Sequence, residues 1–166
     1  MPRTLGQAIG FLFGFWLALA LSPLVVKTAA ASDLDQLSDR LFTEVNRVRA
    51  ERHLVALERR TDLDGVALAH SQDMVRRGYF SHHTPEGANP LDRLIVLKIS
   101  GMTLGAENLG KTTEAEPTRQ IVTNWLASRD HRRNLLAPAF NFTGVGVAHA
   151  ADGALVYTQV YIAVPR

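Results

Sequence analysis

Three segments of the chain carry the side chains best suited to chemistry, and each is expected to lie between regular elements. They are GYFSHHTPEG (78–87, with His82 and His83), GAENLG (105–110, with Glu107) and WLASRDHRRNLL (125–136, with His131). Imidazole and carboxylate groups can bind a divalent ion or transfer a proton. A single loop histidine more often makes a surface hydrogen bond, so no segment defines a site by itself.

Serine hydrolase chemistry is disfavoured by the same segments. Ser81, Ser128, Asp130 and His131 have the residue types of a catalytic triad. However, the chain has no G-x-S-x-G turn to expose a nucleophile, and Ser128 and His131 are close neighbours in sequence rather than parts of a spatial constellation. An H-E-x-x-H pair, which would place two zinc ligands and a base on one helix, is also absent from the sequence.

Four stretches with helical spacing of apolar residues must position these segments. Capping residues, a first-turn proline and terminating glycines set their ends. The first expected helix runs from a cap at Ser32 or Asp33 to about Arg52, and the second from a capping pair at Thr61 and Asp64 to Gly78. The third follows a cap at Asn89 and runs from Pro90 to Ile99, before Gly101, and the fourth begins at about Pro117.

The C-terminal part of the chain has the alternation and composition of β-structure. Small and branched residues alternate over 143–149, Asp152 and Gly153 form a turn signal, and 154–164 is rich in Val, Tyr, Thr and Ile. This pattern predicts a β-hairpin, with a further short strand near 102–104. Helices followed by strands indicate an α+β fold with an antiparallel sheet covered by helices.

The N-terminus has the features of an export signal. An apolar run over 9–26 follows Arg3 and ends in small residues that offer an A-x-A cleavage site at Ala31. We therefore expect 1–31 to be a signal peptide and 32–166 to form one exported domain. An uncleaved membrane anchor is the alternative, because about 18 apolar residues is the lower limit for a spanning helix.

Charge and cysteine usage narrow the functional classes further. The chain has 18 Lys and Arg against 16 Asp and Glu, and the leader contributes Arg3 and Lys27 but no acid. The remaining domain is formally neutral, which argues against a nucleic-acid partner. Arginine pairs such as Arg132 and Arg133 are interpreted as solvated helix ends. The chain has no cysteine, so packing alone must hold the exported domain together.

Five motifs in order resemble the CAP family of cysteine-rich secretory, antigen 5 and pathogenesis-related proteins, in its bacterial cysteine-free branch. The similarity covers nearly all of 37–163. The motifs are VNRVRAERHLVAL (45–57), ALAHSQDMVRRGYFSH (67–82), AENLG (106–110), W-x-x-S-x-x-H-R-x-N-L-L (125–136), and the closing pair FTGVGVA (142–148) and VYTQVY (156–161).

This resemblance implies a three-layer α-β-α sandwich with a small antiparallel sheet between helices. It also implies a cleft into which His82, Glu107 and His131 point. Ser128 occupies the position where many family members have a second glutamate, so the expected set is His, Glu, His. Asn108 and the glycines around it are interpreted as a turn that presents Glu107, and Trp125 as a core residue. His70 is expected to pack or to make a hydrogen bond.

Two imidazoles and a carboxylate form a reasonable ligand set for Zn²⁺ or a similar divalent ion. A metal-free cluster in which Glu107 hydrogen-bonds the histidines is the alternative. The favoured function is a secreted, non-catalytic binding module for a lipid, glycan or metal-assisted ligand, acting as a monomer. The second hypothesis is a metal-assisted extracellular hydrolase acting on peptides, in which His82 and His131 hold the ion and Glu107 ligates it or activates water. Membrane contact is expected only through an uncleaved leader.

Overall fold

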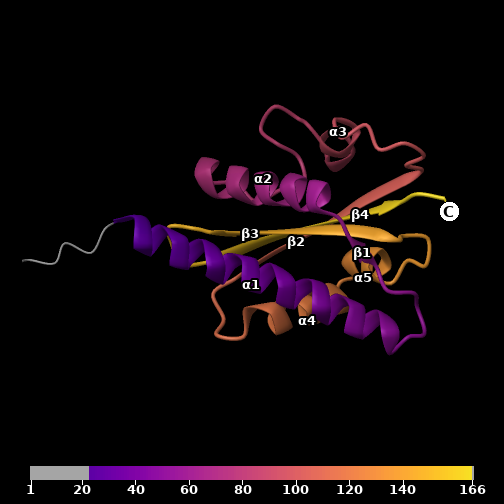
Figure 1. Ribbon diagram of the computed structural model, residues 1–166, viewed down its shortest axis with the longest axis horizontal. Helices are drawn as coiled ribbons and strands as arrows, with labels where there is room; N and C mark the ends of the chain where they lie inside the picture. Colours follow the sequence, from indigo (N-terminus) through magenta and orange to yellow (C-terminus); the bar gives the residue numbers. More distant parts are fainter. Residues whose placement is uncertain (1–22, 166) are drawn as a thin grey trace, which may run out of the picture.

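The computed structural model describes residues 23–165, which form a sheet between two layers of helices (Figure 1). Helices α2 (Thr61–Arg77) and α3 (Pro90–Ile95) cover one face. The other face is covered by α1 (Pro23–Ala50), α4 (Pro117–Ala127) and α5 (Arg129–Leu135). The predicted three-layer α-β-α sandwich of the α+β class is confirmed.

The two longest strands of the sheet are antiparallel neighbours, one inside the sheet and one at its edge. Its order is β1-β3-β4-β2, with β1 (Glu58–Arg59), β2 (Leu104–Thr112), β3 (Phe142–His149) and β4 (Leu155–Ala163). Strands β3 and β4 form the predicted hairpin, and Gly153 turns it with a φ of 83°. Strand β2 pairs with β4 on one side only, so its other side is a sheet edge.

Alternation along the strands divides the core between the two helical layers. In β4, Tyr157 and Tyr161 face α1 and α4, whereas Val160 and Ile162 face α2 and α3. Trp125 of α4 is buried in the first of these clusters, as expected, and its Nε1 donates to the Leu109 carbonyl at 2.7 Å.

The first two helices differ from the sequence prediction at their starts. Helix α1 begins at Pro23 rather than at Ser32 or Asp33. The alanines of 29–31 favour helix strongly, so a chain that still carries them continues through the predicted cap. The leader prediction concerns 1–31, of which 1–22 lie outside the described residues. Helix α2 ends at Gly78 as predicted, but Asp64 does not cap it and instead accepts from the Val145 amide.

Helix α3 confirms the predicted cap and is shorter than expected. Asn89 accepts from the amides of Leu91 and Asp92, and the Asp92 carboxylate accepts from the Asn89 amide, which completes a capping box. The helix ends at Ile95 instead of Ile99, because Lys98 adopts a left-handed conformation with a φ of 48°.

Two predictions about the site segments were wrong. Residues 105–110 form the middle of β2 rather than a turn, and His131, which follows the end of α4, lies within a separate helix, α5, rather than between regular elements. The glycines of β2 mark close packing: a Cβ at Gly105 would lie 2.9 Å from Leu94 Cδ1, and one at Gly110 would lie 2.5 Å from Ile121 Cδ1. They misled the prediction because glycine is depleted in strands.

Helix α2 lies directly on strand β3 because β3 presents glycine to it. A Cβ on Gly146 would be 2.1 Å from the Leu68 amide nitrogen and 2.3 Å from the Ala67 carbonyl carbon, both backbone atoms that cannot rotate away. Ser71 Oγ uses this proximity to donate to the Gly146 carbonyl at 3.1 Å. The sequence F-T-G-V-G-V thus fixes the height of α2 above the sheet.

We expect Gly146→Ala to lower the free energy of unfolding by about 2 kcal/mol or more, because α2 must move off the sheet. Gly65→Ala is the matched control, since no atom lies within 4 Å of its Cβ and the residue is helical. That control should stabilise the protein by about 0.5–1 kcal/mol. Urea unfolding of both variants measures the difference, and equal effects would contradict this account of the α2–β3 contact.

Candidate functional site

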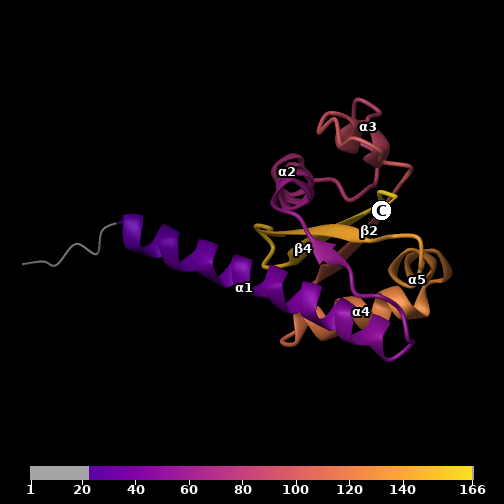
Figure 2. The ribbon, with the colours of Figure 1, turned by 45° about the vertical axis from the view of Figure 1, so that its right-hand side comes forward.

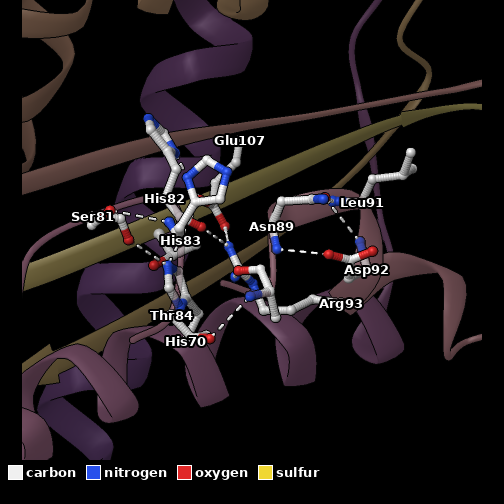
Figure 3. Close-up of polar contacts among 12 residues, drawn as sticks. His70, Ser81, His82, His83, Thr84, Asn89, Leu91, Asp92, Arg93 and Glu107 are labelled. Carbon is white, nitrogen blue, oxygen red and sulfur yellow. Dashed lines mark hydrogen bonds and ion pairs between the residues drawn. The ribbon is translucent and has the colours of Figure 1, made fainter. Parts of the chain in front are cut away.

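Glu107 lies in the middle of the edge strand β2, and its side chain is buried on the α2–α3 face with 1% exposed. Its Oε1 accepts from His82 Nδ1 at 2.8 Å and its Oε2 accepts from Arg93 Nη2 at 2.8 Å (Figure 3). A buried carboxylate requires such partners, because desolvation otherwise disfavours its charge. Both oxygens are thus engaged by neighbouring side chains.

Arg93 of α3 is the counter-ion of Glu107 and also fixes the loop that carries His82. Its Nη2 donates to the His82 carbonyl at 3.0 Å and its Nη1 to the Ala88 carbonyl at 3.2 Å. The side chain is 14% exposed. The Asn89 capping box positions α3, and through it the guanidinium. One cation therefore joins α3, the 78–89 loop and strand β2.

His82 is the solvent-facing member of this group. Its side chain is 43% exposed, and the carboxylate of Glu107 fixes Nδ1 as the nitrogen that donates. This orientation leaves Nε2 as the ring nitrogen available to a ligand. The neighbouring His83 is exposed, and only its backbone amide is bonded locally, to Ser81 Oγ.

His70 supports the same group from α2. Its ring is 1% exposed, its Nε2 lies 3.1 Å from the Ser81 carbonyl, and the same nitrogen is 3.8 Å from Glu107 Oε1. Burial lowers the pKa of His70, an effect that the nearby Glu107 carboxylate opposes. The ring thus holds the backbone just before His82, which confirms the predicted packing and hydrogen-bonding role.

His131 approaches from the opposite side of the β2 edge, on α5. Its ring centroid lies 6.4 Å from that of His82 and 6.4 Å from that of Trp125. Burial, followed by the nearby His82, lowers the pKa of His131 below its usual value, so the imidazole is neutral near pH 7. The structure brings His82 and Glu107 into direct contact, and brings His131 next to His82.

A buried amide network ties α5 to β2. Asn108 Nδ2 donates to the His131 carbonyl at 3.0 Å, and Asn134 Nδ2 donates to Asn108 Oδ1 at 3.0 Å and to the Glu107 carbonyl at 3.3 Å. Asn108 is fully buried, and its Nδ2 also donates to the Tyr161 hydroxyl at 3.2 Å. Successive residues of one strand, Glu107 and Asn108, thereby position one histidine each.

Arg49 of α1 fixes the far end of α5. It is fully buried, and it donates from Nη1 to the carbonyls of Leu135 and Ala137 at 2.9 and 3.0 Å. Desolvation lowers its pKa from the ordinary arginine value. The carbonyls at the end of α5 thus receive a charged donor, which stabilises the helix that carries His131.

The contacts of Glu107 bear on whether these residues suit a metal. The carboxylate is already engaged by His82 at one oxygen and by Arg93 at the other, and the Arg93 guanidinium repels a cation at that position. Within residues 23–165, no group of three or more histidine or acidic side chains has the arrangement of metal ligands. The set that includes Glu107 as a ligand therefore does not fit, and the imidazoles of His82 and His131 remain as two adjacent nitrogen donors.

Arg93, Asn108 and Asn134 were not assigned to the site by sequence reasoning. Arg93 stands among apolar residues in PLDRLIVL, and an arginine on a short helix with no acid at i+4 could have signalled a distant partner. Asn134 lies three residues after His131, which is one helical turn. No local signal connects Asn108 to it, because the contact joins strand and helix across 26 residues.

Comparisons with known proteins place this fold and these motifs in one family. The sequence model of the cysteine-rich secretory protein family, CAP, matches residues 42–161. Bacillus subtilis YkwD is 33% identical over 135 residues, which are 81% of this chain and 50% of YkwD. A solved extracellular SCP-domain protein of Bacillus anthracis is 31% identical, with a TM-score of 0.69, over 86% of this chain and 44% of that protein.

The chain belongs to the CAP family, and its lack of cysteine and its bacterial relatives agree with the predicted cysteine-free bacterial branch. An outer surface protein of Borrelia burgdorferi shares the fold, with a TM-score of 0.70 at 20% identity over 78% of this chain and 94% of that protein. The chain spans half the length of YkwD. Among helices of the described residues, none has the length and hydropathy needed to cross a membrane.

The buried Glu107–Arg93 pair yields a prediction on stability. Arg93→Met leaves the carboxylate buried without its counter-ion and should cost about 3–5 kcal/mol of unfolding free energy. Adding Glu107→Gln removes the orphaned charge, so the double variant should be more stable than the sum of the single effects predicts, by about 1–3 kcal/mol.

The matched control for this cycle is the exposed ion pair between Arg77 and Glu86, where Glu86 has 67% of its side chain exposed. Arg77→Met should cost less than about 1 kcal/mol because solvent screens that pair. Urea unfolding of the wild type, Arg93→Met, Glu107→Gln and the double variant gives the coupling. Strictly additive effects of Arg93→Met and Glu107→Gln would contradict the assigned contact.

Proposed function

We propose that this protein is an exported CAP-domain binding protein in which His82 and His131 contact a small ligand without chemical turnover. The observation that carries the proposal is the engagement of Glu107: its carboxylate is 1% exposed and holds His82 through Nδ1 and Arg93 through the other oxygen. Glu107 is thus a positioning residue. The ligand-facing groups are the imidazoles of His82 and His131, which come from opposite sides of the β2 edge. Their ring centroids are 6.4 Å apart.

The same contact argues against the hydrolase hypothesis. A general base must reach the water or substrate proton that it removes. The Glu107 carboxylate is 1% exposed and each of its oxygens accepts from a neighbouring side chain, so neither oxygen is directed to a water or substrate in solvent. Ser81, the hydroxyl next to His82, accepts from the His83 amide rather than donating to a histidine.

Export is supported by the sequence and by a relative. Residues 9–26 form an apolar run followed by the small residues that precede Ser32, the pattern of a signal peptide. The Bacillus anthracis protein at 31% identity is described as extracellular. The site would then work outside the cytoplasmic membrane, either free after cleavage at Ala31 or tethered by the uncleaved leader.

Half-exposed apolar side chains on the 78–89 loop and on α3 favour a ligand with an apolar portion. Phe80 precedes His82 by two residues and is 50% exposed, and Leu91 of α3 is 47% exposed. A lipid, or a glycan that offers the apolar face of a sugar ring, could contact such side chains while the imidazoles bind its polar groups. A long-chain fatty acid and a chitin oligomer serve as separate probes of these two classes.

NMR titration with each probe tests the binding proposal. We expect at least one probe to shift the amides of 80–84 and 129–134, with the shifts lost in His82→Ala and His131→Ala but kept in His83→Ala, the exposed neighbour. Peptide and cell-wall substrates are incubated in parallel with and without a chelator. Chelator-sensitive cleavage lost in Glu107→Gln would establish the hydrolase instead, and no shift with either probe would refute the ligand class.

A divalent ion held by the two imidazoles is the second candidate. A carboxylate that accepts from Nδ1 is the usual support of a metal-ligating histidine, and Glu107 has that position relative to His82. In this arrangement Zn²⁺ would be bound by His82 and His131, with solvent completing the coordination.

Calorimetric titration with Zn²⁺ separates a ligand from a supporting residue. His82→Ala and His131→Ala should each abolish the binding heat, while Glu107→Gln should retain binding weakened by about 10–100-fold, the usual effect of losing a supporting carboxylate. His83→Ala should bind like the wild type. Binding heats equal to that of the wild type in all four variants would refute the metal site. Complete loss of binding in Glu107→Gln would show that Glu107 is itself a ligand.

A further inference from the structure

The outward face of α5 lines a cavity that has no role in the histidine site. Three arginines border this cavity of about 520 Å³, together with Leu136, Ala137 and Pro138. The arginines are Arg129, Arg132 and Arg133, and all three are exposed. Figure 2 shows α5 at the periphery of the molecule beside α4.

Helical spacing explains how one seven-residue helix serves both surfaces. Residues at i, i+3 and i+4 share a face, which brings Arg129 together with Arg132 and Arg133. His131 and Leu135 lie on the opposite face, where Leu135 is fully buried and His131 meets Trp125. The sequence interpretation of Arg132 and Arg133 as solvated helix ends missed this convergence, because α5 was not predicted as a separate helix.

The positive charge of this cavity is only partly balanced. Asp130 pairs with Arg133 at 2.9 Å, and both side chains are largely exposed. Arg132 donates from Nη1 to the Leu126 carbonyl at 3.3 Å, and no ion pair among the described residues includes Arg129 or Arg132. The residues that line the cavity include no acid. Two guanidinium charges therefore remain available to an anion.

The placement of Arg129 is unfavourable for the isolated helix. Arg129 is the first residue of α5, where the helix dipole disfavours a cation, whereas Arg132 and Arg133 lie in the last turn, where the dipole favours them. Like charges at i, i+3 and i, i+4 add repulsion. An anion bound in the cavity would relieve this repulsion and the unfavourable placement of Arg129.

We propose that this cavity binds a phosphate group carried on an organic ligand. The planar guanidinium matches phosphate oxygens with two parallel charge-assisted hydrogen bonds, which a lysine cluster could not provide. The volume exceeds that of one phosphate and lies in the range of small-molecule sites. Leu136 and Pro138 supply an apolar wall for the carbon skeleton next to the phosphate. This site is independent of the proposed histidine function.

Glycerol 3-phosphate and phosphatidylglycerol vesicles present this chemistry from two sources, a soluble phosphorylated compound and a lipid headgroup. NMR titration of the full chain with glycerol 3-phosphate should shift the amides of 129–138. The double variant Arg129→Gln/Arg132→Gln should weaken binding by about tenfold or more, because two charge-assisted bonds are lost. Sedimentation with phosphatidylglycerol vesicles, compared with phosphatidylcholine vesicles, provides the second arm.

Arg76→Gln is the control, since Arg76 is 72% exposed on α2 and its substitution removes one positive charge outside the cavity, as Arg129→Gln removes one within it. The single variant Arg129→Gln should melt at the wild-type temperature or above it, which separates lost binding from lost folding. Binding in either arm that depends on Arg129 and Arg132 supports the site and identifies its source. Binding in neither arm, or equal loss in Arg76→Gln, would overturn it.

Discussion

The burial of the Glu107 carboxylate is the constraint on which the rest of the site depends. A charge with 1% of its side chain exposed is tolerable only with partners, and Arg93 and His82 supply them from a short helix and a loop. The same guanidinium binds the His82 carbonyl, and His70 binds the carbonyl one residue earlier. Side chains that gather around one buried carboxylate thereby hold a loop that has no regular structure.

Strand β2 extends this constraint to both helical layers. Because side chains alternate along a strand, Glu107 faces α2 and α3 while Asn108 faces α5. The backbone at the sheet edge is also used: the Glu107 carbonyl accepts from Asn134 and the Leu109 carbonyl from Trp125. Covering an edge strand in this way removes a template for aggregation and places two histidines over the same edge.

The sequence predicted the parts of this structure that have local causes. The Asn89 cap, the Gly78 stop and the β3–β4 hairpin depend on short-range hydrogen bonds and backbone preferences, and all were found. The short strand expected near 102–104 reaches only the first residue of β2, and the rest of β2 was missed because its glycines match packing partners, Leu94 and Ile121, that belong to other elements. Contacts between distant residues, such as Arg93 with Glu107, leave no local pattern. The His82 and Glu107 assignments came from motif resemblance, and the structure adds how the two contact.

The orientation of the His82 ring is the most direct test of this account. Nitrogen chemical shifts of the imidazole, measured by NMR at about pH 8 where an ordinary histidine is neutral, identify which ring nitrogen carries the proton. A carboxylate accepting at Nδ1 predicts the Nδ1-protonated tautomer, and Glu107→Ala should shift the ring to the ordinary mixture of tautomers. An Nε2-protonated His82 that does not respond to Glu107→Ala would contradict the claim that Glu107 positions this histidine.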